Sequence, residues 1–282
     1  MNFFTNRIEE RYRTYCLNHF PSTRWGKQLQ SLKRKYSGKR CFIIGNGPSL
    51  RAEDLNRLKN EYTFAFNRIY YIFDQTDWRP TFYCTQDDKI ATSSVDEINS
   101  KIKTPFIFAP INLKWYYGID LHTNYFFNQL RAEAETKCPE FSEDISSWIG
   151  VGNTVAYTAM QLAAYMGFTE IYLLGIDHSF HTYQDQKGNI ITDPTAKDYF
   201  CSDYSNVKES LFVPRLDLST LSYTAAQKYV ETHPVKIYNA TRGGKLEVFP
   251  RVDFDALFVK KKDNENETRK KPAKNWDRTK LY

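Results

Sequence analysis

The loop at residues 45–50 has the composition of a nucleotide-binding turn. It reads Gly-Asn-Gly-Pro-Ser-Leu and follows a short apolar segment at residues 40–44. Glycine lets a phosphate or a ribose approach main-chain N–H groups, and proline fixes the entry into a following helix. The loop lacks the lysine of a Walker A loop and the third glycine of a dinucleotide fingerprint, so a plain tight turn is an equal alternative. The predicted nucleotide contacts in this loop are Gly45, Asn46, Gly47, Pro48 and Ser49.

A second group of reactive side chains surrounds Asp177, at the end of the apolar segment 170–177. A carboxylate there binds a ligand or caps the next loop, and we favour a ligand because ligands bind beyond the carboxyl ends of parallel strands. His178 and His181 follow, and an imidazole can accept a proton near neutral pH. The alternative for each histidine is a solvated loop residue without a catalytic role.

Nucleotide contacts are also predicted at another strand end and at a helix start. Asn67 follows the buried segment 63–66. Gly152, Asn153 and Thr154 open a helix, whose first N–H groups can stabilise a phosphate without a metal ion.

Three charged residues bear on metal and phosphate binding. Asp87 and Asp88 resemble the metal-binding carboxylates of many glycosyltransferases, but an exposed acidic turn is the favoured interpretation. We therefore expect no required cofactor, with Mg²⁺ as an alternative. Arg242 follows a strand and can contact a phosphate through two nitrogens, or pair with Glu247 or Asp253.

These residues would be brought together by an α/β fold. Short apolar runs alternate with helical patterns, which predicts a Rossmann-like, mostly parallel sheet with helices on both faces. The carboxyl ends of parallel strands share one edge, so the candidate residues should gather there. Ser49 is expected to cap the helix that follows the glycine loop. The secondary structure of residues 110–147 cannot be assigned from the sequence pattern. The predicted strands are 40–44, 63–66, 81–84, 106–109, 170–177 and 235–238, and the later helices are 152–166 and 219–232.

The sequence predicts three parts. Residues 1–37 are polar with apolar side chains at helical spacing, which indicates a helical N-terminal extension. Residues 38–258 would form the Rossmann-like catalytic domain that binds the nucleotide. Residues 259–282 hold nine Lys or Arg against four Asp or Glu, which is typical of a flexible basic tail. The tail is expected to aid solubility, or to attach the protein weakly to anionic lipid.

Composition also restricts the cellular setting and the partners. The five cysteines are scattered without zinc or C-x-x-C spacing, and no apolar run reaches the ~20 residues of a membrane span. The N-terminus lacks the order of a signal peptide. We expect a cytoplasmic protein, or one bound peripherally at the inner membrane face through its tail. Outside the tail the net charge is close to zero, which argues against a nucleic-acid partner.

Two blocks of the sequence resemble known families. One block is residues 45–50 with Asn67, and the other is residues 167–177. Together they resemble the family annotated for hydroxymethylpterin diphosphokinase (MptE-like), and the bacterial lipooligosaccharide sialyltransferases, which use CMP-sialic acid. The resemblance spans about residues 40–258.

The resemblance to the sialyltransferases implies that cytidine nucleotide binds residues 46–49 and Asn67. It also implies that Asp177 holds the ribose or an active-site partner, and that residues 152–154 contact the phosphate. The sequence departs from the sialyltransferase pattern at two places. Residues 148–151 contain no arginine. Residues 215–217, Arg-Leu-Asp, stand near the position that the resemblance implies for the catalytic histidine, which makes Asp217 a further candidate for the base. The donor sugar and the base therefore do not follow from the resemblance.

The leading hypothesis is glycosyl transfer from a nucleotide sugar, such as a CMP-linked sialic-acid-like donor, to a bacterial surface glycan. The acceptor would be a free or lipid-linked glycan of lipopolysaccharide or capsule biosynthesis. One alternative is Mg²⁺-dependent diphosphate transfer from ATP to a pterin alcohol, in which Asp87, Asp88 or Asp177 would bind the metal. The other is a non-catalytic nucleotide-binding protein of glycan assembly.

Overall fold

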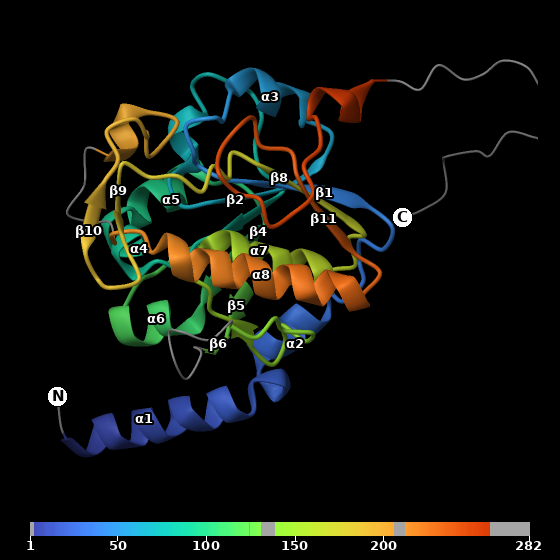
Figure 1. Cartoon of the computed structure of the whole chain (residues 1–282). Helices are drawn as coiled ribbons and strands as arrows, with labels where there is room; N and C mark the ends of the chain where they lie inside the picture. The colour runs from blue at the N-terminus through green and yellow to red at the C-terminus, as the bar shows by residue number, and fades with distance from the viewer. Residues whose placement is uncertain (1–2, 124, 131–138, 206–211, 260–282) are drawn as a thin grey trace, which may run out of the picture.

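A seven-stranded parallel sheet forms the centre of the protein. The computed structural model describes residues 3–123, 125–130, 139–205 and 212–259 (Figure 1). The strand order is β11-β8-β1-β2-β3-β4-β5, and every neighbouring pair is parallel. The predicted α/β class is therefore confirmed. The strands are β1 (Arg40–Ile44), β2 (Tyr62–Phe66), β3 (Phe82–Cys84), β4 (Phe106–Pro110), β5 (Tyr125–Phe127), β8 (Glu170–Leu174) and β11 (Lys236–Asn239).

The strands are apolar on both faces because helices cover both faces. Residues 41–44 of β1 are fully buried, as expected for a central strand of a parallel sheet. In Figure 1, α7 (Val155–Tyr165) and α8 (Leu216–Thr232) lie side by side below the sheet, and α3 (Ala52–Arg57) lies above it. The remaining α-helices between strands are α4 (Asp88–Ser93), α5 (Val95–Lys101) and α6 (Ile111–Tyr117).

The sheet changes its direction of growth between β1 and β8. From β1 the chain adds β2, β3, β4 and β5 on one side, whereas β8 and β11 lie on the other side. In doubly wound sheets, such a switch point opens a crevice at the carboxyl ends of the two strands. The loops after β1 and β8, which carry Gly47 and Asp177, both leave the sheet there.

The N-terminal residues form helices, as predicted. These are α1 (Phe3–Asn18), the 3₁₀ turn η1 (Phe20–Ser22) and α2 (Arg24–Gln30). Phe20 and Leu29 are fully buried in the main core. Of these three elements, α1 lies farthest from the sheet, at the periphery of the molecule (Figure 1). The three-part division of the chain stays a prediction.

Small elements connect the larger ones. An insertion between β8 and α8 contains the hairpin β9 (Thr182–Gln184) and β10 (Ile190–Thr192), followed by η3 (Ser202–Ser205). The other short elements are η2 (Ile69–Ile72), β6 (Gln129–Leu130), β7 (Ile149–Gly150) and η5 (Asp255–Phe258).

The structure corrects one local prediction and leaves another outside its range. The helix after the glycine loop begins only at Ala52, and Arg51 rather than Ser49 precedes it, so Ser49 does not cap it. Of the predicted basic tail, all but Val259 lies outside the described residues. Within the described ranges, no helix is long and apolar enough to cross a membrane.

Candidate functional site

A cavity of about 590 Å³ lies at the carboxyl edge of the sheet, at the switch point. This volume is in the range of sites for nucleotide-sized ligands. Its walls come from the loops after β1, β2, β3 and β8, from the start of α7 and from the insertion before α8. The predicted residues in its lining are Gly45, Asn46, Gly47, Asn67, Asp87, Asp88, Gly152, Asn153, Thr154, Asp177 and His178.

The glycines after β1 allow the loop to pack against the end of β8. Gly45 N–H donates to Leu174 O over 2.8 Å, and Gly47 N–H donates to Gly175 O over 2.9 Å. A Cβ on Gly47 would lie 1.9 Å from Asp177 Oδ2 and 2.8 Å from Gly175 O. The loop is thus both a turn and part of the cavity wall. The expectation that its N–H groups are free to hold a phosphate is wrong for Gly47, whose N–H is already bonded.

Asn46 presents an acceptor atom at the cavity wall. Its side chain is 9% exposed, and its Nδ2 donates to Phe66 O over 3.0 Å and to Tyr204 Oη over 3.4 Å. Its Oδ1 is buried and has no hydrogen-bond partner among the described residues. Leaving a buried acceptor unpaired is costly, so a ligand hydroxyl or amino group donating to Asn46 Oδ1 would be favourable.

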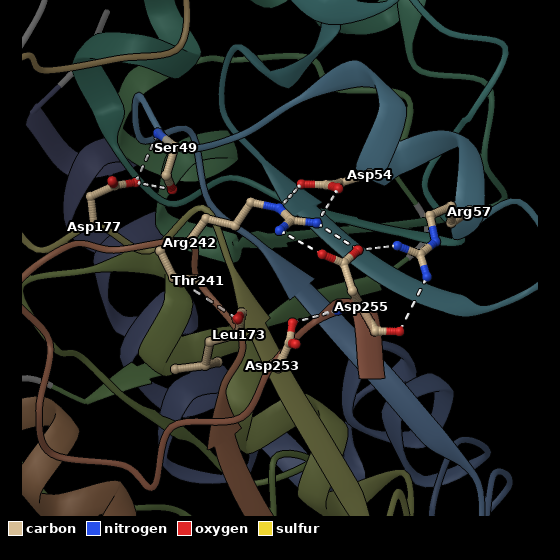
Figure 2. A network of polar contacts seen from close by, with 9 residues as sticks. All are labelled: Ser49, Asp54, Arg57, Leu173, Asp177, Thr241, Arg242, Asp253 and Asp255. Carbon is tan, nitrogen blue, oxygen red and sulfur yellow. Dashed lines mark hydrogen bonds and ion pairs between the residues drawn. The ribbon is translucent and has the colours of Figure 1, made fainter. Parts of the chain in front are cut away.

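Asp177 is held by the glycine loop. It is 7% exposed, and its Oδ2 accepts the Ser49 hydroxyl over 2.7 Å and the Ser49 N–H over 3.4 Å (Figure 2). Burial raises the pKa of Asp177. Ser49 therefore positions Asp177 and does not line the cavity itself. A neighbouring cavity of about 360 Å³ is lined by Pro48 and Asp177, and Ser49 does not line that one either.

His178 follows Asp177 in a left-handed backbone conformation, with φ of 52°. Its Nε2 lies 2.9 Å from the Thr220 hydroxyl, and that hydroxyl donates its proton to Leu216 O over 2.8 Å. The Thr220 oxygen therefore accepts from Nε2–H, which leaves Nδ1 as the basic nitrogen of the neutral ring. Burial lowers the pKa of His178 to about 4, so its imidazole is neutral at pH 7.

The other two candidate bases are engaged elsewhere and do not line the cavity. His181 Nδ1 contacts Asp193 O at 2.9 Å. Asp217 accepts two hydrogen bonds from Arg215, over 3.0 and 2.8 Å, and these bonds lower its pKa. Position therefore favours His178, because it is the one of these three residues that lines the cavity.

The start of α7 is held in place by contacts with residues outside the loop that faces the cavity. Thr154 Oγ1 accepts the Ala156 N–H over 3.3 Å and caps the helix. Buried Gln161 holds Gly150 through both its amide atoms, over 2.8 and 3.0 Å. Gly152 packs on α8, because a Cβ there would lie 2.6 Å from Ser222 Oγ. The N-terminal end of an eleven-residue helix thus borders the cavity.

The two acidic residues after β3 have different surroundings. Asp87 Oδ1 accepts the Ile90 N–H over 3.0 Å and so caps α4, and burial raises the pKa of Asp87. Asp88 lies in the first turn of the same helix. Within the described ranges, no group of three or more His, Cys, Asp or Glu side chains could hold a metal ion.

Arg242 belongs to an ion-pair network outside the cavity lining (Figure 2). Its guanidinium donates to Asp54 over 2.8 and 2.9 Å and to Asp255 over 2.9 and 2.8 Å. The predicted pairing with a carboxylate is therefore present, but the partners are Asp54 and Asp255 instead of Glu247 or Asp253. Arg242 is therefore held by carboxylates and does not line the cavity in which a phosphate would bind.

Sequence reasoning missed several cavity residues because they lie in irregular segments. Tyr199 stacks on Tyr204 at 3.9 Å, and Phe180 meets Tyr199 edge-on at 6.1 Å, all three from the insertion before α8. Gln86, by contrast, lies after β3 on the edge where the sequence predicted polar residues to gather, and it accepts the Thr158 hydroxyl over 2.5 Å. For the missed residues, only the density of aromatic residues in the insertion offered a signal in the sequence.

Comparison with known proteins identifies one family and several similar structures. The sequence profile of the family described as "6-hydroxymethylpterin diphosphokinase MptE-like" matches residues 15–182. A search of curated proteins gives no match. The MAf glycosyltransferase from Magnetospirillum magneticum AMB-1 is similar over 84% of this chain, with 12% identity and a TM-score of 0.49. The chain spans 40% of the length of that protein.

The sialyltransferase CstII from Campylobacter jejuni is also similar in structure. Its complex with the substrate analogue CMP-3FNeuAc matches 76% of this chain and 86% of CstII, with 18% identity and a TM-score of 0.44. Its complex with cytidine-5'-monophosphate matches 71% of this chain and 79% of CstII, with 18% identity and a TM-score of 0.36.

Proposed function

The chain belongs to the MptE-like family, and from this premise we propose that it is a glycosyltransferase. It would move a sugar from a nucleotide donor to a hydroxyl of a bacterial surface glycan. The observation that carries the proposal is the neutral His178, positioned beside Asp177 in a cavity of nucleotide size. A CMP-linked, sialic-acid-like donor is the first choice, because residues 45–50 and Asn67 resemble the CMP-binding loop of the sialyltransferases.

In this reaction the acceptor hydroxyl loses a proton as it attacks the sugar. His178 would take this proton on Nδ1, since its Nε2–H is bonded to Thr220. A base with a pKa of about 4 is weak but is never blocked by protonation at neutral pH. The departing nucleotide phosphate would be stabilised by the N-terminus of α7, after Gly152, Asn153 and Thr154.

The charge of the cavity favours a donor with few phosphate charges. Its described lining holds four aspartates and one arginine, Arg215, whose guanidinium is paired with Asp217. The end of a helix contributes only about half a positive charge. One phosphodiester matches this environment, whereas a triphosphate without a metal ion would be repelled by the carboxylates.

The same acidic lining supports the second candidate function when Mg²⁺ is added. The family description names a diphosphokinase, which would transfer diphosphate from ATP to a pterin alcohol. Asp87, Asp88 or Asp177 would then bind Mg²⁺, and the metal would offset the triphosphate charge. His178 would deprotonate the pterin hydroxyl in the same manner as a glycan hydroxyl.

Calorimetric titration with CMP, UMP, GDP and ATP, each with Mg²⁺ and with a chelator, separates these functions. Binding of CMP in the presence of chelator supports glycosyl transfer. Binding of ATP only with Mg²⁺, followed by turnover of a pterin alcohol, would establish the diphosphokinase in its place. Nucleotide binding without turnover of any donor would leave the accessory role in glycan assembly.

A further inference from the structure

The net charge outside the tail is close to zero, but positive and negative charges are unevenly distributed along the chain. Residues 1–40 hold ten Lys or Arg and two Glu, a net charge of +8. Residues 41–258 hold twenty Lys or Arg and twenty-seven Asp or Glu, a net charge of −7. The net positive charge of residues 1–258 therefore lies in the N-terminal helices and the turns that follow them, although most of the basic residues lie elsewhere.

The peripheral helix α1 also carries an exposed apolar stripe. Ile8, Tyr12 and Tyr15 are 68%, 60% and 62% exposed. Their spacing of four and three residues places them on one face of the helix. Tyrosine, with an apolar ring and a polar tip, is a side chain typical of membrane interfaces.

The opposite side of α1 is occupied by contacts within the protein. Glu9 and Glu10 both pair with Arg13, each at 3.3 Å. Arg13 lies over the Tyr116 ring at 5.0 Å, and the Tyr116 hydroxyl donates to Glu10 over 3.4 Å. Glu10 thus faces Tyr116 of α6 and Glu9 is paired with Arg13, whereas Arg11 lies one helical turn from Tyr15 beside the stripe.

We propose that α1 is an interfacial helix that binds the surface of an anionic lipid membrane. The stripe of Ile8, Tyr12 and Tyr15 would enter the headgroup region, and the basic N-terminal segment would be attracted by the lipid charge. The charge of residues 1–40 is complementary to anionic lipid, and no acidic side chain of α1 lies on the stripe.

A second copy of the chain is the competing occupant, because residues 41–258 carry a net negative charge that could attract the basic N-terminal segment. Three side chains exposed to this extent offer roughly 400 Å² of surface, against the roughly 800 Å² per partner of a stable interface. At a lipid interface, electrostatic attraction to anionic lipid adds to the smaller buried apolar area, so the stripe fits a membrane better than a dimer.

Cosedimentation of the full chain with vesicles tests the proposal. Vesicles of phosphatidylcholine with phosphatidylglycerol are compared with vesicles of phosphatidylcholine alone. The triple variant Ile8→Ser/Tyr12→Ser/Tyr15→Ser is expected to lower the partition coefficient on anionic vesicles by roughly tenfold or more, because it removes the inserted apolar surface. Ile190→Ser is the matched control, because Ile190 is a comparable side chain, 56% exposed, on β10.

A second variant separates insertion from loss of helical structure. Tyr12→Phe/Tyr15→Phe keeps the aromatic rings and is expected to bind anionic vesicles within about twofold of the wild type. Nucleotide binding should be the same in all these proteins, since α1 does not line the cavity. A failure of the membrane proposal is therefore distinct from a failure of the proposed function.

Two results would overturn the proposal. Equal vesicle binding by the wild type and the triple variant would assign membrane attachment to another part of the chain, such as the basic tail. Sedimentation of the wild type as a dimer and of the triple variant as a monomer, with no binding of either to vesicles, would assign the stripe to self-association.

Discussion

Replacing Arg242 by methionine tests the assignment of this residue to stability rather than to phosphate binding. Methionine keeps an unbranched stem but removes every hydrogen bond to Asp54 and Asp255 (Figure 2). The Asp54 side chain is 5% exposed, so its carboxylate would stay buried without its cation. We therefore expect a marked loss of stability with no loss of nucleotide affinity.

The magnitude follows from the burial of the pair. Removing one partner of a fully buried ion pair costs ~3–5 kcal/mol. A quarter of the Arg242 side chain is exposed, so solvent screening reduces the cost to about 2–3 kcal/mol. For a protein of this size, that loss lowers the Tm by roughly 5–10 °C.

Urea denaturation of Arg242→Met measures the loss in the free energy of unfolding. Calorimetric titration with CMP, at a temperature where the variant is folded, measures its nucleotide affinity. Lys59→Met is the control, because Lys59 pairs with Asp77 on the surface, where the two side chains are 43% and 93% exposed. It should change the free energy of unfolding by less than about 0.5 kcal/mol. Arg242→Met/Asp54→Asn should regain part of the lost stability, because no uncompensated charge stays buried.

The opposite pattern would refute the assignment. If Arg242→Met unfolds like the wild type but binds CMP roughly tenfold more weakly, the guanidinium contacts the phosphate and the network of Figure 2 rearranges when ligand binds.

Three further predictions concern the cavity. His178→Ala should lower the transfer rate by roughly a hundredfold or more and remove the acidic limb of the pH profile of kcat/KM. Because only the neutral ring accepts a proton, the lowered pKa of about 4 places this limb near pH 4 in the wild type, and a limb that persists in the variant would identify another base. Asp177→Asn should reduce the transfer rate by about two orders of magnitude with little change in Tm, and full activity of this variant would show that the active site lies elsewhere. Gly47→Ala should both destabilise the fold by ~1–3 kcal/mol and weaken nucleotide binding, since its Cβ displaces the Asp177 carboxylate; a stability equal to the wild type in urea would contradict the packing described for the loop.

The sheet could be predicted because its strands are continuous apolar runs. Residues 40–44 and 170–174 are flanked by glycine or polar turns, and buried parallel strands have this pattern. The strand β5 and helix α6 could not be placed, because the aromatic residues near Trp115 and Tyr125 suit either type of element. Boundaries of one to three residues also differed, as at the start of α8, which begins at Leu216.

The sequence predicted that the candidate residues lie together, but it did not predict the hydrogen-bond partners of their side chains. The rule for parallel sheets placed Asn46, Asp177 and His178 on one edge, and they line one cavity. That Ser49 bonds Asp177 depends on the register of β1 against β8. That Arg242 pairs with Asp54 depends on contacts between residues far apart in sequence, which local patterns do not encode.

Product analysis of a transfer assay tests the central claim most directly. The protein is incubated with a surface-glycan acceptor and CMP-, UDP- or GDP-activated sugars in the presence of a chelator, and the released nucleotide is measured. The account predicts acceptor-dependent release of nucleotide, with CMP-activated sugar as the preferred donor, and its loss in Asp177→Asn. Release of AMP from ATP on addition of Mg²⁺ and a pterin alcohol, without turnover of any nucleotide sugar, would contradict it.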